Sequence, residues 1–223
     1  MKKIIKSKFL YPIILFLAFA AFTITVKRFD VAPIGPNESE VGFSTINQFF
    51  QIIFPWNELP YNISNVLGVV TIAIAAFFFI FTIVDIIKKK SIKKADAGLI
   101  VLMFYFALIV ALYILFDKVI VINYRPVILN VVLEPSYPST HTFMAISVLL
   151  AAKLQFALKI KDDFNSWLVT SLCNVCLIVL IACRLISGVH WFSDIIGGIL
   201  LGSALYSLYF AIVSKIYKSD AVR

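Results

Sequence analysis

Both histidines of the chain stand beside residues that bind phosphate or move protons. His141 ends the sequence Pro-Ser-Thr-His, and Asp194 follows His190 by four positions. Histidine titrates near neutral pH, which suits it to general acid–base work. A carboxylate four residues away can fix the tautomer of a histidine and stabilise its cationic form, so that the other ring nitrogen is free as a nucleophile. These residue types point to phosphoryl or proton transfer.

Three cations lie close to these histidines in the sequence. Lys118 and Arg125 are seven positions apart, Pro126 follows Arg125 directly, and Arg184 precedes His190 by six positions. Seven positions are about two turns of a helix, so this spacing predicts that Lys118 and Arg125 project from one helical face and that Pro126 disrupts the helix. Two cations on one face would bind one anion. Taken alone, the spacing also fits two interfacial side chains that reach for water.

Residues 135–141 are predicted to form a loop that runs into a helix. Ser139 stands where an N-cap is expected, and the free backbone N–H groups of a first helical turn bind anions. The Ser139 hydroxyl would add a donor, and His141 would stand beside it to give or take a proton. The alternative is an ordinary cap with an incidental histidine. Later in the chain, the Ser-Gly pair at 187–188 would let Arg184 fold back over the same place.

The chain that carries these residues is 61% hydrophobic, against roughly half in a soluble domain. The excess lies in long blocks, and a spanning helix needs about 20 apolar residues. We therefore expect an all-α, polytopic membrane protein that forms one domain over residues 1–223. The first block also has the basic start of a signal peptide, but its apolar run continues through Val26, which favours an uncleaved helix. The six predicted spans are residues 9–26, 64–87, 97–116, 141–158, 167–183 and 194–214.

The net charge of +8 is explained by the side of the membrane on which the cations fall. With the N-terminus inside, fifteen of the 20 Lys and Arg residues lie on the inner side, as the positive-inside rule requires. This distribution favours membrane orientation over nucleic-acid binding as the reason for the charge. It predicts that both termini are cytoplasmic. The five outer cations are Lys27, Arg28, Lys118, Arg125 and Arg184.

The longest predicted connection, residues 27–62, contains four prolines and is expected to be an outer loop. Within it, residues 44–54 place apolar side chains at near-helical spacing, which predicts a short helix lying on the outer leaflet. This helix could anchor the loop or gate the entry of lipid.

In the last predicted span, Gly198 and Gly202 fit either a homodimer contact or close packing against a neighbouring helix.

The cysteines and histidines do not suggest a metal or redox site. Cys173, Cys176 and Cys183 all lie in one apolar stretch, where cysteine usually packs as a small hydrophobic residue. Two histidines without a second group of ligands make a poor zinc site. We therefore expect no disulfide, no metal and no other cofactor.

Together, three motifs resemble the signature of the type 2 phosphatidic acid phosphatase (PAP2) superfamily. They are Lys-x6-Arg-Pro from Lys118, Pro-Ser-x-His ending at His141, and Arg-x5-His-x3-Asp from Arg184 to Asp194. The resemblance covers residues 118–194. It implies a six-helix, PAP2-like bundle and a metal-independent phosphatase of the membrane branch.

The resemblance also assigns roles by position. It implies that His190 forms a phosphohistidine, that Asp194 orients it, and that His141 protonates the leaving group and later activates water. Two positions depart from the family, which usually has Gly where Thr140 stands and Ser where Cys183 stands. Threonine keeps the backbone N–H, although its bulk reshapes the pocket, whereas Cys183 lacks a strong hydroxyl donor. The implied phosphate-binding residues are Lys118, Arg125, Ser139, Thr140 and Arg184.

These features predict hydrolysis of a membrane lipid phosphate or diphosphate at the outer face of a plasma membrane, bacterial by composition. Phosphatidate, phosphatidylglycerophosphate and a polyprenyl diphosphate are the candidate substrates. One alternative is a phosphotransferase that passes the same phosphate to another lipid or sugar. Another is a non-catalytic protein that binds or transports lipid phosphates. The complete set of His141, His190 and Asp194 favours catalysis over the latter.

Overall fold

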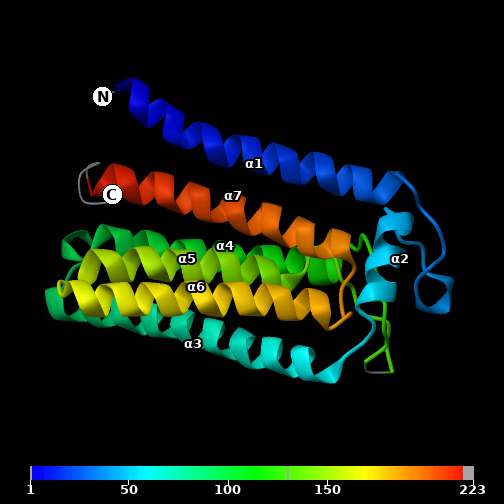
Figure 1. The fold of residues 1–223 in the computed structure, drawn as a ribbon. Coiled ribbons are helices and arrows are strands. Elements are labelled where there is room, and N and C mark those ends of the chain that lie inside the picture. The colour runs from blue at the N-terminus through cyan, green and yellow to red at the C-terminus, as the bar shows by residue number, and fades with distance from the viewer. Residues whose placement is uncertain (1, 130, 218–223) are drawn as a thin grey trace.

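The computed structural model describes residues 2–129 and 131–217, and within that range the chain forms helices and loops but no strand (Figure 1). Six of the helices, all except α2, are long and apolar enough to cross a membrane. The prediction of an all-α membrane bundle with six spans is therefore confirmed. The α-helices are α1 (Lys2–Arg28), α2 (Ser44–Ile53), α3 (Glu58–Lys89), α4 (Ala97–Ile114), α5 (Thr140–Lys159), α6 (Asp163–Ile186) and α7 (Phe192–Ile216). Shorter turns are the 3-10 helices η1 (Pro36–Glu38) and η2 (Ile92–Lys94) and the π-helical η3 (Leu115–Val119).

Several spans extend beyond the apolar blocks of the sequence. Helix α3 begins at Glu58, six positions before the predicted start, because the side chain of Asn57 accepts the N–H of Leu59 and so caps the helix. Pro60 falls in the first turn, where proline removes no helical hydrogen bond. A proline that indicates a loop in the sequence therefore lies inside a helix.

Helices α5 and α7 are the most buried of the six spans. Helix α5 packs against α7, α6 and α3, while α1 lies along the outer side of α7 (Figure 1). A Cβ atom on Gly198 would lie 2.9 Å from the carbonyl oxygen of Ser139, and one on Gly202 would lie 2.8 Å from Cβ of Ile146. These two glycines therefore let α7 approach α5 closely. Packing within the chain accounts for both of them, and a homodimer through the same face stays a prediction.

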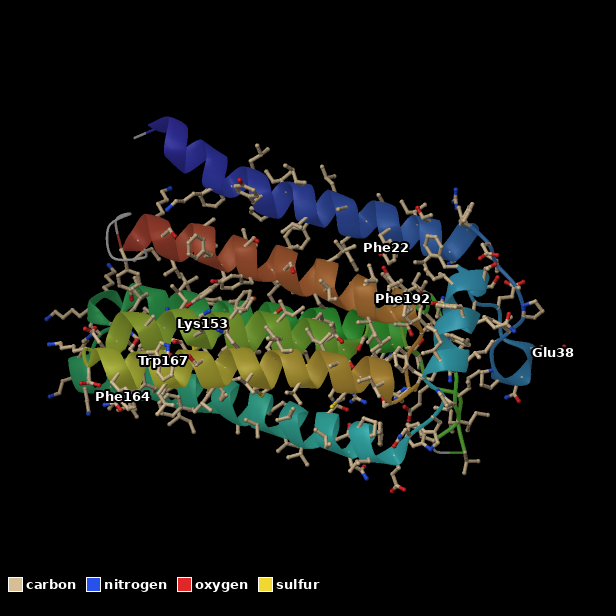
Figure 2. All side chains as sticks on the ribbon, in the orientation of Figure 1. Phe22, Glu38, Lys153, Phe164, Trp167 and Phe192 are labelled. Carbon is tan, nitrogen blue, oxygen red and sulfur yellow. The ribbon has the colours of Figure 1, made fainter. Side chains whose placement is uncertain are left out.

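The bundle has two chemically different ends. Helix α1 begins and α7 ends at the end away from α2 (Figure 1), where the α3–α4 and α5–α6 connections also lie. Figure 2 places Lys153, Phe164 and Trp167 toward this end, and Phe192 and Glu38 toward the end that carries α2. The structure thus separates the cations into the two groups of the charge count, while the cytoplasmic assignment of one end stays a prediction. Described cations at or near the end away from α2 are Lys8, Lys88, Lys89, Lys90, Lys93, Lys94, Lys153, Lys159, Lys161 and Lys215.

The predicted short helix is α2, and it is attached to the start of α7. The ring of Phe50 stacks on Phe192 with centroids 4.0 Å apart, and Oδ1 of Asn47 accepts the backbone N–H of Ser193 at 2.9 Å. Its other side is exposed, with Ile52 as the clearest case. One polar and buried side and one exposed apolar side are typical of an interfacial helix.

Candidate active site

A cavity of about 700 Å³ lies among α3, the end of α4 and the start of α5, at the end that carries α2. Four of the predicted site residues line this cavity, and we call them the outer layer. The other four are buried, and we call them the inner layer. The backbone N–H of Ser139 donates to the carbonyl oxygen of Asp194, and Thr140 and His141 follow Ser139 directly, so the two layers meet at the start of α5. The outer layer is Lys118, Arg125, Thr140 and His141. The inner layer is Ser139, Arg184, His190 and Asp194.

The first motif reaches the site by a route that its spacing did not predict. The expectation that Lys118 and Arg125 share a helical face is wrong, because the helix ends at η3 and Arg125 lies in an extended segment. Residues 119–122 are all β-branched, and the residue before Pro126 is disfavoured in the α region. The backbone N–H of Arg125 instead donates to the carbonyl oxygen of Glu134 at 3.0 Å. The chain reverses between Arg125 and Glu134, and this reversal, in place of a continuous helix, brings Lys118 and Arg125 to the cavity.

Each cation of the outer layer is paired with a carboxylate that also lines the cavity. Nζ of Lys118 lies 2.8 Å from Oδ2 of Asp117, and the Lys118 side chain is 74% exposed. Nη2 of Arg125 lies 3.2 Å from Oε2 of Glu134, and the Arg125 side chain is only 15% exposed. Nε of Arg125 is buried and has no hydrogen-bond partner in the described part of the chain. Arg125 therefore combines burial with an unused donor, whereas Lys118 is solvated.

The Pro-Ser-x-His motif forms the start of α5, as predicted. Ser139 is the N-cap residue, but its side chain makes no capping bond and instead accepts a hydrogen bond from Oγ1 of Thr142 at 3.0 Å. The backbone N–H of Ser139 donates to the carbonyl oxygen of Asp194 at 2.9 Å, which ties the start of α5 to the start of α7. The Ser139 hydroxyl keeps its own proton as a donor, and the first turn of α5 has free backbone N–H groups, which is a combination that can bind an anion.

Arg184 lies in the last turn of α6 and is almost completely buried. Its Nη2 donates to Oδ1 of Asn65 at 2.9 Å, and its guanidinium carbon lies 5.4 Å from the centre of the Tyr61 ring. Nε and Nη1 have no partner within residues 2–129 and 131–217. Helix α3 thus holds one edge of this guanidinium group and leaves two donor nitrogens for another partner.

His190 and Asp194 are both buried and face each other across the turn into α7. Nδ1 of His190 lies 3.6 Å from Oδ2 of Asp194, which is slightly longer than a hydrogen bond. The same carboxylate oxygen accepts the backbone N–H of Trp191 at 3.0 Å. Oδ1 accepts the side-chain amide of Asn123 at 3.2 Å. The carboxylate is therefore held by these two hydrogen bonds, with Oδ2 facing the histidine.

Burial holds the pKa of His190 well below its usual range, and the positive charges of Arg125, Arg184 and His141 lower it further. His190 is therefore neutral near pH 7. A neutral imidazole with its Nδ1 proton directed at Asp194 has its lone pair on Nε2. That is the protonation state required of a nitrogen nucleophile.

The turn between α6 and α7 depends on Gly188, as the sequence predicts. Its φ angle is +64°, which is the left-handed region where a side chain is strained. A Cβ atom there would also lie 2.5 Å from the carbonyl oxygen of Phe54. The glycine thus reverses the chain four residues after Arg184 and brings His190 and Arg184 to the same site.

Sequence reasoning missed several residues that complete the site. Asn65 and Tyr61 hold Arg184, Asn123 holds Asp194, and Gly68 makes room for His141, because a Cβ there would lie 2.8 Å from its Cδ2 atom. The sequence offered one signal for these residues: Asn65 and Asn123 are polar side chains inside or next to apolar runs. The three cysteines are free thiols.

The six spans and the convergence of three motifs resemble those of PAP2-type membrane proteins. The comparison with protein-family models agrees, since the PAP2 superfamily model matches residues 122–218. The predicted resemblance is thereby confirmed, and the match includes every predicted site residue except Lys118.

A solved structure is also similar over nearly the whole chain. It is a transmembrane PAP2-type phosphatidylglycerolphosphate phosphatase from Bacillus subtilis. The TM-score is 0.65 at 17% identity, and the match covers 93% of this chain and 98% of the other. At this identity the likeness establishes the fold. A search of the curated proteins finds no significant match.

Proposed function

We propose that this protein is a lipid phosphate phosphatase that works through a phosphohistidine on His190. The observation that carries the proposal is the pair of guanidinium groups of Arg125, which is partly buried, and Arg184, which is buried, because each has a buried donor nitrogen without a partner in the described residues. A buried cation without a full set of partners is costly, and an anion with several acceptor oxygens relieves that cost. Phosphate is such an anion, and it would lie within reach of a neutral imidazole.

In the proposed reaction, Nε2 of His190 attacks the phosphorus atom and the bond to the lipid oxygen breaks. His141 donates its proton to the departing oxygen. His141 then takes a proton from water, the water oxygen attacks phosphorus, and the bond between phosphorus and Nε2 breaks, which regenerates both histidines. The guanidinium groups of Arg125 and Arg184 neutralise charge on the equatorial oxygens, and Asp194 stabilises the positive charge on His190.

The two layers imply an order of events. Thr140 and His141 line the cavity, whereas His190 is only 3% exposed behind them. Phosphate must therefore exchange with the carboxylate of Glu134 on Arg125 before it reaches Nε2. Lys118, which is solvated and paired with Asp117, would make the first contact.

Several features support a lipid as the substrate. The cavity borders Val69 and Ile72 of α3 and Tyr113 of α4, which belong to spanning helices. The solved structure that shares the fold is a phosphatase of phosphatidylglycerolphosphate. We therefore propose a membrane lipid monophosphate or diphosphate, with phosphatidate, phosphatidylglycerophosphate and polyprenyl diphosphate as the compounds to compare, at the outer face of the membrane.

The test is phosphate release by the purified protein in mixed micelles from these three lipids and from glucose 6-phosphate, with and without excess chelator. Hydrolysis of at least one lipid in chelator, with much slower hydrolysis of the sugar phosphate, is expected. Activity that chelator abolishes and Mg²⁺ restores would refute the metal-independent mechanism. Transfer of phosphate to an added lipid alcohol or sugar in place of water would identify a phosphotransferase. Tight binding of the lipids without turnover would identify a binding or transport protein.

A further inference from the structure

The side chain of Asn123 contacts the carboxylate of Asp194, which faces the proposed nucleophile His190. Asn123 is 1% exposed and stands in the extended segment between Lys118 and Arg125. Its carbonyl oxygen accepts the backbone N–H of Ser136 at 2.9 Å, so its backbone is fixed against the segment that contains Ser136. The position of its side chain is therefore determined by the same chain reversal that places Arg125.

The side-chain amide of Asn123 contacts the oxygen of Asp194 that the histidine does not face. Nδ2 donates to Oδ1 of Asp194 at 3.2 Å and lies 3.5 Å from Oγ of Ser193. Oδ2 of the same carboxylate accepts the Trp191 N–H and lies 3.6 Å from Nδ1 of His190. The two carboxylate oxygens thus have different tasks: one is anchored and the other is presented to the histidine.

We propose that Asn123 is a positioning residue for catalysis, which orients Asp194 so that Oδ2 keeps the proton of His190 on Nδ1 and leaves Nε2 free. The inference rests on the proposed function for its catalytic consequence, and on the hydrogen bonds above for its geometry. An amide suits this position because it is a donor without charge. A second carboxylate here would compete with Asp194 for protons. The other charged or titratable groups around Asp194 are His190, His141, Arg125, Arg184 and Tyr137.

Asn47 offers a matched control. It is also a fully buried amide, and it binds the same Ser193 through Nδ2 to Oγ and through Oδ1 to the backbone N–H, each at 2.9 Å. It holds α2 to α7, and its side chain forms hydrogen bonds with Gly42 and Ser193. If Asn123 only tied its loop to Ser193, replacing either asparagine by alanine would have the same kind of effect.

The first experiment is the pH profile of lipid phosphate hydrolysis for wild type, Asn123→Ala, Asn123→Asp and Asn47→Ala. Asn123→Ala should lower kcat about 10- to 100-fold at every pH, which is the usual size for losing a hydrogen bond to a charged group. Asn47→Ala should lower thermal stability and leave the shape of the profile unchanged. Equal profiles for the two alanine variants would refute the proposal.

The aspartate variant gives the sharper result. When the two carboxylates of the Asn123→Asp variant share one proton, the new carboxyl group can donate that proton to Asp194 as the amide did. Activity should therefore persist at the acid end of the profile. When the pH rises and both carboxylates ionise, the donor is lost, so the alkaline limb of the Asn123→Asp profile should move to lower pH. An alkaline limb at the wild-type position would contradict the proposed role.

A second experiment does not depend on turnover. The chain has two histidines, so ¹⁵N-histidine labelling gives two rings, which a His141→Gln variant assigns. His190 should show one tautomer with the proton on Nδ1 in wild type and in Asn47→Ala, and a mixture in Asn123→Ala. A mixture already present in wild type, or no change in Asn123→Ala, would overturn the inference. A chain with the expected spectra that hydrolyses no lipid phosphate would instead refute the proposed function.

Discussion

Gly68 permits a test in which stability and activity should change in opposite directions. It lies in α3, lines the cavity, and has no positive φ angle. A Cβ at this position would lie 2.8 Å from Cδ2 and 3.1 Å from Nε2 of His141. Ordinary contacts between carbon atoms are about 3.5–4.0 Å, so the imidazole ring must move by about 1 Å in a Gly68→Ala variant.

The two effects of Gly68→Ala can be sized separately. Replacing glycine by alanine inside a helix stabilises a protein by about 0.5–1 kcal/mol, because the unfolded chain loses conformational freedom. A displacement of about 1 Å of a catalytic group can lower the rate about 100-fold. The atom that the new methyl group meets is at the end of a side chain that can move, so the helix should form normally. We therefore expect unchanged or raised thermal stability and a 10- to 100-fold lower kcat.

The measurement is kcat for a lipid phosphate and for nitrophenyl phosphate, together with the thermal unfolding midpoint in detergent. If His141 is the leaving-group acid, the loss should be smaller with nitrophenyl phosphate, whose departing oxygen needs little help from a proton. Val66→Ala, on the exposed side of the same helix, serves as the control and should leave both rates unchanged. Wild-type activity in Gly68→Ala would refute the placement of His141 against α3, and equal losses on both substrates would refute its role as the acid.

Three further predictions test the roles of the histidines, the ionisation of His190 and the orientation of the chain. Rapid acid-free quenching should trap phosphoenzyme in wild type and none in His190→Ala, and phosphoenzyme that persists in His190→Ala but is absent from His141→Ala would reverse the assignment of the two histidines. The folded protein holds the pKa of His190 below the value of about 6.5 that it has in an unfolded chain, so the unfolded state binds the proton more readily. The free energy of unfolding should therefore fall as the pH drops below about 6.5. The loss is at most about 1.4 kcal/mol per pH unit and ends at the folded pKa. In thermal unfolding between pH 7 and pH 5, His190→Gln should lose less stability than wild type, and an equal loss would contradict a buried neutral histidine. Single cysteines at the exposed positions Glu38 and Lys90, in a background without the native three, should react with an impermeant reagent from opposite sides of the membrane, and labelling from one side only would overturn the topology.

The spanning helices could be predicted because each is determined by a local property. An apolar block of about 20 residues must satisfy its backbone hydrogen bonds internally, whatever surrounds it. Their ends could not be predicted as well, because they depend on individual capping side chains. Asn57 and Asp162 each accept a backbone N–H at the start of a span and extend α3 and α6 beyond their apolar blocks.

Motif spacing predicted which residues the fold would bring together, but it did not predict part of their geometry. The Ser139–His141 segment and the Gly188 turn follow local rules of helix capping and backbone conformation, and the structure has them as expected. The segment from Lys118 to Arg125 depends on hydrogen bonds to residues 134–136, which are distant in sequence and carry no helical or strand period. The residues that support the site, such as Asn65 and Asn123, were missed for the same reason, since their partners lie 119 and 71 positions away.

The supporting residues also explain how an apolar bundle tolerates this site. A buried polar group without a partner costs about 1–3 kcal/mol, and more when it is charged. Arg184 relieves part of this cost through Asn65 and Tyr61, and Arg125 relieves part through Glu134, but neither uses all of its donors. A fully satisfied pair of guanidinium groups would be more stable and would bind phosphate less well, because every donor would first have to leave its partner. In the proposed function, the partial satisfaction would therefore join stability to activity. The close packing of α5 against α7 keeps the bundle folded, and the remaining donors would bind a phosphate group.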